Sequence, residues 1–168
     1  TPVAAAAELL RAEFPSLAGR LAEIRTARVE TVGVVAPKAQ LQLPPLAGLI
    51  GRDEAFFSAV SRDTVPDTAY RGFTFHFRPG VLDEEGKIRR IAEVLGLSRA
   101  ALGSENVVAT VNRLPALRVG HGDLIRVVDA ELTGSRLALT GNYFTGVAIE
   151  DCVTRSRGEF ERLRREGW

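Results

Sequence analysis

The chain has 168 residues, 45% hydrophobic and 26% charged, a composition that suits one compact folded domain and argues against disorder. Its formal net charge of +1 gives no general attraction to nucleic acid. A single cysteine, Cys152, excludes an internal disulfide framework and any multi-cysteine metal site. The absence of a disulfide framework fits a reducing cytoplasm, where we expect the protein. No apolar run is long enough to span a bilayer, so we expect no transmembrane segment.

The first half of the chain predicts two short helices followed by strands. Alanine-rich sequence favours the first helix, which Phe14-Pro15 ends, and valine-rich alternation favours the first strand. Alternation is cleanest over 72–78, where three phenylalanines face one way and polar residues including His76 and Arg78 face the other. We expect helices at 2–13 and 17–24, strands at 28–36, 55–61 and 72–78, a loop around a short strand at 37–51, and a turn at 62–68.

The second half of the chain alternates helices and strands without a regular βαβ pattern. Acidic residues lead an amphipathic helix that Gly96 stops. Gly134 stops the next helix, whose apolar side would carry Leu124, Val127, Val128 and Leu132. The mixed order predicts an α+β (mixed α/β) fold. We expect helices at 83–95, 122–132 and 147–165, strands at 105–114 and 136–140, and a turn at 141–146.

Several common catalytic motifs are missing. Gly120-His121-Gly122 lacks the third glycine of a dinucleotide-binding loop, and no serine lies in a nucleophile elbow. His76 and His121 are the only histidines, too few for a histidine-rich metal site, so we expect no metal and a hydrogen-bonded or exposed role for both. The arginines of 155–165 alternate with glutamates, which predicts a solvated helix face.

The segment 137–153 carries the chemistry that the sequence does suggest. A short apolar strand ends at Gly141, and Gly146 precedes a helix that begins with small apolar residues and no Ser or Asp cap. The first amides of such a helix lack partners and lie at the positive end of its dipole, where an anionic group is stabilised. The two glycines would let a flat ligand approach closely.

This segment resembles the C-terminal FAD motif of the protoporphyrinogen oxidase family, within the flavin-containing amine oxidase superfamily. The matching residues are Gly141-Asn142, the helix start Gly146-Val147-Ala148, and Cys152. Pro115 with Val119-Gly120-His121 resembles the family's proline and Gly-His run before the penultimate helix. Two positions depart from the family, Thr110 and Leu117, where it often carries an aromatic residue and a tyrosine, which leaves the substrate open between a porphyrinogen and another compound.

The resemblance implies an FAD-dependent oxidoreductase of which this chain is the C-terminal, substrate-side part. Residues 1–134 would belong mostly to the substrate-side α+β region and 135–168 to the FAD domain, with the N-terminal dinucleotide-binding half absent and the isolated chain inactive. The substrate would be small and hydrophobic or conjugated, and contact with a membrane surface is possible. Catalytic residues and oligomeric state are not assigned. Cofactor-binding residues would be Gly141, Asn142, Gly146, Val147 and Ala148, and substrate-side candidates are His76, Arg78 and Tyr143.

An alternative reading is a non-catalytic module that binds a ligand or a partner chain. In that case Phe73, Phe75 and Phe77 would form its apolar binding face, although three phenylalanines on one side of a strand more often belong to a core.

Overall fold

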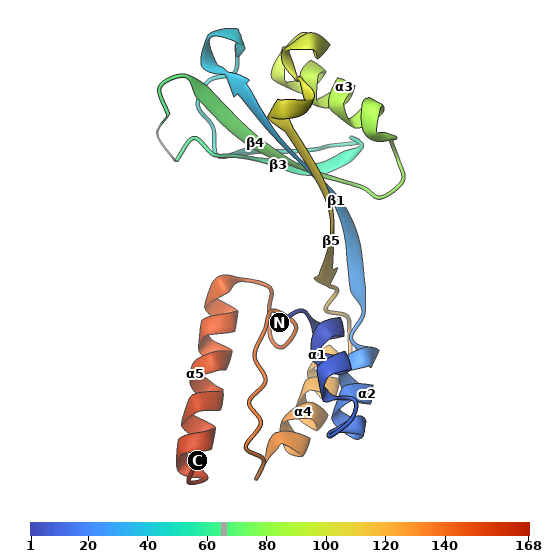
Figure 1. Cartoon of the computed structure of the whole chain (residues 1–168), viewed down its shortest axis with the longest axis vertical. Helices are drawn as coiled ribbons and strands as arrows, with labels where there is room; N and C mark the ends of the chain where they lie inside the picture. Colours follow the sequence, from blue (N-terminus) through green and yellow to red (C-terminus); the bar gives the residue numbers. More distant parts are fainter. Residues whose placement is uncertain (65–66) are drawn as a thin grey trace. The chain divides into compact units, whose positions relative to one another are not determined.

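The computed structural model describes residues 1–64 and 67–168 and divides the chain into two compact units. The first unit combines Thr1–Ala27 with Leu114–Trp168, and the second is Arg28–Arg113 (Figure 1). Length suggested one domain, and the resemblance suggested a boundary between residues 134 and 135. The two compact units have other bounds, because both ends of the chain build one core; the assignment of 1–134 and 135–168 to a substrate side and an FAD domain stays a prediction.

The regular structure of the first unit is helical, apart from the ends of two strands that continue into the second unit. Its core brings the apolar sides of the two N-terminal helices together with Ile125, Val128 and Leu132 and with the buried rings of Tyr143 and Phe144. The helices are α1 (Val3–Leu10), α2 (Pro15–Glu23), α4 (His121–Leu132) and α5 (Ile149–Arg165).

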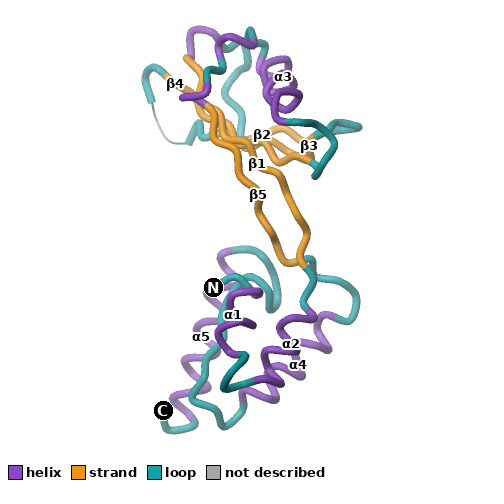
Figure 2. The backbone as a smooth tube through the Cα atoms, turned by 45° about the vertical axis from the view of Figure 1, so that its right-hand side comes forward, coloured by secondary structure: helices purple, strands orange, loops and turns teal. Residues whose placement is uncertain are grey.

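The structure corrects the prediction for residues 136–140 and part of the prediction for α4. Residues 136–140, expected as a buried strand, are not a strand; they run extended beside α5, whose side chains bind their backbone groups (Figure 2). On α4 the predicted Val128 and Leu132 are buried, but the third buried residue is Ile125, whereas Val127 is exposed.

The second unit is a five-stranded sheet covered by a helix. Neighbouring strands follow the order β2-β3-β4-β1-β5, and the pairs β2–β3, β3–β4 and β4–β1 are antiparallel. The strands are β1 (Thr26–Pro37), β2 (Gly48–Ile50), β3 (Phe56–Ser61), β4 (Tyr70–Phe77) and β5 (Val107–Pro115). The first two residues of β1 and the last two residues of β5 belong to the first unit. Short 3-10 turns occur at Lys38–Gln40, Arg99–Ala101 and Ser104–Asn106.

Helix α3 (Glu84–Leu95) lies on one face of this sheet (Figure 1). It begins one residue after the predicted start, because Asp83 is its N-cap and accepts a hydrogen bond from the Gly86 amide. It ends, as predicted, at Gly96, which is in the left-handed conformation. Ile91 and Leu95 pack against the face that carries Phe73, Phe75 and Phe77, all of which are buried. The phenylalanines are therefore core, which removes them as the binding face of a non-catalytic module.

The α+β fold class predicted from the sequence is confirmed by these helices and this antiparallel sheet. Val65 and Pro66, within the turn predicted at 62–68, lie outside the described residues. Across the described ranges, none of the helices combines the length and the apolar character that crossing a membrane requires.

Candidate functional site

The turn that follows residue 140 is anchored by two buried aromatic rings. Tyr143 and Phe144 are each about 1% exposed, and their ring centroids lie 4.8 Å apart. Burial raises the pKa of the Tyr143 phenol. Tyr143 was a substrate-side candidate in the sequence, but here it belongs to the core of the first unit and fixes the conformation of the turn.

Gly141 and Gly146 are needed by the chain itself. A Cβ added to Gly141 would lie 2.4 Å from Cε1 of Tyr143, and one added to Gly146 would lie 2.0 Å from Oδ2 of Asp151. Real Cβ atoms do not approach other atoms so closely, so both positions require glycine or a local shift. The space beside these two Cα atoms, which we expected to be open to a ligand, is thus filled by the side chains of Tyr143 and Asp151.

The helix after the turn starts later than predicted, and a carboxylate of its first turn bonds the amide that precedes it. α5 begins at Ile149 rather than Val147, because Ala148 is extended and its amide donates to the Asp151 carboxylate at 3.1 Å. Glu150 and Asp151 place two carboxylates in the first turn, where the helix dipole stabilises them. As predicted, no side chain at the N-cap position bonds the first amides of the helix. The sequence analysis did not foresee that Asp151 reaches back from inside the helix to the Ala148 amide.

Three exposed apolar residues lie at the start of α5. Val147 and Ile149 are 58% and 84% exposed, and Ala148 between them is also exposed. We call these three residues the Val147–Ile149 ledge. Asn142 is partly buried in the turn that leads to it. The predicted cofactor-binding residues therefore lie in one continuous stretch, of which the ledge is the part that a ligand could cover.

His121 joins the two sequence segments on which the family resemblance rests. It is the first residue of α4, and its Nε2 lies 2.8 Å from the backbone oxygen of Phe144. Hydrogen bonding with that carbonyl confirms the structural role expected for this histidine. This bond joins residues that are 23 positions apart in the sequence. It brings the Val119-Gly120-His121 run into contact with the Gly141–Gly146 turn. His121 also lines a hollow of about 270 Å³ with Ile24, Arg118 and Leu124.

The charged residues of α5 include a buried network that the sequence did not suggest. Glu159 is buried and accepts a hydrogen bond from the Leu139 amide at 3.2 Å, and both Arg155 and Arg162 form ion pairs with it. Arg162 also donates to the backbone oxygens of three residues, Leu132, Ser135 and Leu137. Its bonding to Glu159 raises the pKa of Arg162. The prediction of a solvated face is wrong for these residues and fits only outward ones such as Arg157.

Arg155 completes the support of the turn. Its guanidinium lies 3.9 Å from the centre of the Phe144 ring and its Nε donates to the Leu139 oxygen at 3.1 Å. Spacing along α5 shows that Arg155, Glu159 and Arg162 share one side of the helix, which is the signal that sequence analysis could have used. What the spacing cannot show is that residues 137–139 lie against that side.

The other two substrate-side candidates belong to the second unit. His76 on β4 lies opposite Thr31 of β1 and Ser58 of β3, and its Nδ1 is 3.3 Å from the Ser58 hydroxyl. Arg78 extends over the Phe57 ring, 5.4 Å from its centre. His76 and Arg78 thus share the sheet face that does not carry the buried phenylalanines, whereas Tyr143 lies in the first unit.

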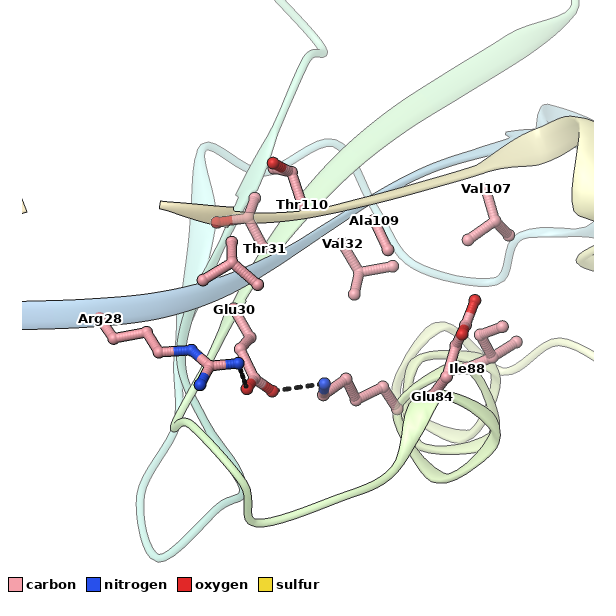
Figure 3. Close-up of a pocket in the computed structure, with 11 residues that line it drawn as sticks. Arg28, Glu30, Thr31, Val32, Glu84, Ile88, Val107, Ala109 and Thr110 are labelled. Atoms are coloured by element: carbon pink, nitrogen blue, oxygen red, sulfur yellow. Dashed lines mark hydrogen bonds and ion pairs between the residues drawn. The ribbon is translucent and has the colours of Figure 1, made fainter. Parts of the chain in front are cut away.

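A hollow of about 230 Å³ opens between α3 and the β1–β5 side of the sheet (Figure 3). Its walls are mostly apolar and include Val32, Ile88 and Ala109. At one end Glu30 accepts from Arg28 at 3.1 Å and forms an ion pair with Lys87 (Figure 3). The hydrogen bond from Lys87 lowers the pKa of Glu30 despite burial, so the carboxylate is charged at neutral pH.

No metal centre is evident in the parts of the chain that the structure describes, where no three His, Cys, Asp or Glu side chains gather as ligands. No protein-family model matches the chain, and no curated protein matches it significantly.

Proposed function

We propose that this chain is the substrate-side, C-terminal part of an FAD-dependent oxidoreductase of the protoporphyrinogen oxidase and amine oxidase type. The observation that carries the proposal is the contact between His121 and the Phe144 carbonyl. The two segments that resemble the family separately are hydrogen-bonded to each other, as parts of one site would be. Cytoplasmic location, a small hydrophobic or conjugated substrate, and inactivity of the isolated chain belong to the same proposal.

The chain's residues fit one part of a flavin site better than another. The Val147–Ile149 ledge is exposed and apolar, which suits contact with a flat ring. The positive end of α5 is already used by Asp151, which bonds the Ala148 amide. We therefore assign the ledge an apolar contact with the isoalloxazine, and we do not assign α5 the role of stabilising negative charge on the reduced ring.

When bound, the flavin would supply the redox chemistry by accepting a hydride from the substrate. The role of this chain would be to cover the ring, exclude water and orient the substrate. Gly141 and Asn142 would lie toward the ribityl and pyrophosphate part, as the resemblance implies. His76 and Arg78 offer one hydrogen-bonding group and one positive charge on an open sheet face, and they remain the candidates for holding the substrate.

The test is the absorption spectrum of the full-length protein that contains this chain. We expect the purified protein to show flavin absorption, or to acquire it on adding FAD. A colourless full-length protein that binds no added FAD would overturn the proposal. A colourless isolated 168-residue chain agrees with it, because the dinucleotide-binding half would hold most of the cofactor.

A further inference from the structure

The outer strand β5 of the sheet in the second unit has a long free edge. β5 ends the strand order, spans nine residues, and is exposed along nearly all of its length. Val108 and Val111 are 72% and 51% exposed. An exposed edge strand that is rich in β-branched residues is a template for pairing with another strand.

The backbone groups that face outward can be identified. A Cβ on Gly33 of β1 would lie 3.8 Å from the Val108 oxygen, and the amide just beyond β5, that of Ala116, donates to the Arg25 oxygen at 2.8 Å. Even-numbered residues of β5 therefore point their N–H and C=O groups toward β1, and odd-numbered residues point theirs outward. Ala109, Val111 and Arg113 thus offer hydrogen-bonding groups at the free edge.

Common protections of an edge strand are missing from β5. Arg113 is its only charged residue, and its only proline, Pro115, is at its end. The opposite edge strand, β2, has just three residues, which limits pairing there. Of the two edges of this sheet, β5 is the one open to a partner.

We propose that β5 pairs antiparallel with β5 of a second copy of this chain, about a two-fold axis at Val111. The two copies of Val111 would then form a hydrogen-bonded pair, and Ala109 would lie opposite Arg113 of the second copy. Because each of these residues faces outward, the three pairs across the axis (one Val111 pair and two Ala109–Arg113 pairs) would all be hydrogen-bonded.

Charge complementarity supports this register. Ala109 and Glu84 line the same two adjoining hollows between α3 and the sheet, of about 230 and 460 Å³. Figure 3 shows the Glu84 side chain extending from α3 toward the strand that carries Ala109. Arg113 of the second copy, opposite Ala109, would therefore reach a carboxylate, while the two copies of Arg113 stay apart.

The side chains on the other face of β5 are also self-complementary. Thr110 would lie opposite Asn112 of the second copy. The Asn112 amide nitrogen already donates to the Thr31 hydroxyl at 2.9 Å. Its Oδ1 stays available to accept from the Thr110 hydroxyl of the second copy, so a polar pair would flank the Val111 axis.

The first test is the molecular mass in solution of the 168-residue chain and two variants, measured by light scattering over a concentration series. We expect a dimer, and we expect Val111→Lys to raise its dissociation constant by about tenfold or more, because two ammonium groups would meet at the axis. Ile50→Lys is the matched control: it adds the same charge at an exposed aliphatic residue of the opposite edge. A monomeric parent chain, or equal effects of the two variants, would overturn the proposal.

A second test fixes the register and does not depend on how well the lysine variant folds. In a Cys152→Ser background, Val111→Cys should form an intermolecular disulfide on mild oxidation, since the two Cα atoms of a hydrogen-bonded pair lie about 5.5 Å apart. Val108→Cys should not, because its two copies would be displaced along the strands. Cross-linking at 108 and not at 111 would contradict the Val111 axis.

Discussion

At the scale of single residues, the turn at 141–146 depends on contacts between its own side chains. Tyr143 fills the space beside the Gly141 Cα, and Asp151 fills the space beside the Gly146 Cα. The glycine spacing was visible in the sequence, but its cause was not, because a glycine next to a ligand and a glycine next to a folded-back side chain have the same spacing. The structure shows the second cause at both positions.

Gly141→Ala is therefore expected to destabilise the first unit by about 2 kcal/mol, since its Cβ would overlap the Tyr143 ring at 2.4 Å. Gly122→Ala is the matched control in the same unit. It lies within α4 with nothing near its Cβ, so alanine should be neutral or stabilise by about 0.5 kcal/mol. Urea unfolding of both variants measures the difference; equal stability would show that the turn is not packed as described.

Asp63 gives the second unit a pH-dependent contribution to stability. Arg71 donates to its carboxylate at 2.8 and 2.6 Å, and this bonding lowers the pKa of Asp63 from 3.8 to about 2. Because the folded-state pKa lies below the unfolded one, the stabilisation is fully present above about pH 4 and is lost as the pH falls toward 2.

The measurement is the free energy of unfolding of the parent chain and of Asp63→Asn between pH 6 and pH 2. The difference between them is expected to be largest above about pH 4 and to shrink toward pH 2, because only the parent loses the charged pair. A difference that is constant over this range would mean that Asp63 and Arg71 are not paired in solution.

At the scale of elements, α5 holds the extended segment 137–139 through buried charges. Glu159→Ala would leave Arg155 and Arg162 without their shared buried carboxylate and the Leu139 amide without its acceptor. We expect a loss of about 3 kcal/mol. Glu161→Ala, which removes an exposed partner of Arg157, should change stability by less than about 0.5 kcal/mol. Thermal unfolding distinguishes them, and similar losses would contradict the buried network.

The same helix shows how far local sequence carries a prediction. The apolar period, the leading acidic residues and Gly96 predicted α3 nearly to the residue, because these determinants all lie within or beside the helix. For residues 136–140, apolar residues between two turns resembled a strand, yet in the first unit their partners are the side chains of α5. Local pattern predicts an element when its determinants are local, and it fails when a distant element supplies the hydrogen bonds.

The candidate site divides in the same way. The stretch from Gly141 to Ala148 was identified from sequence, and the structure shows it as one turn that leads to an exposed apolar ledge. The contact of His121 with Phe144 could not be predicted, because it joins residues from two separate segments. The bond of Asp151 could have been predicted, because a carboxylate at the third position of a helix commonly accepts from the amide before the helix.

At the scale of the whole molecule, two separate cores organise the chain. One is built from both ends of the chain and contains the turn and α5; the other is built from the middle and contains the sheet, α3 and the free edge of β5. The proposed flavin contact belongs to the first unit and the proposed pairing to the second. The two proposals can therefore fail independently, since they rest on different residues and different measurements.

The central claim is that the Val147–Ile149 ledge contacts a flavin, and flavin content of two variants of the full-length protein tests it most directly. Val147 and Val153 are 58% and 55% exposed, and Val153 lies one turn into α5, beyond the ledge. We predict that Val147→Asp lowers the flavin retained per mole of purified protein, while Val153→Asp retains as much as the parent. Equal flavin content in both variants and the parent would contradict the claim.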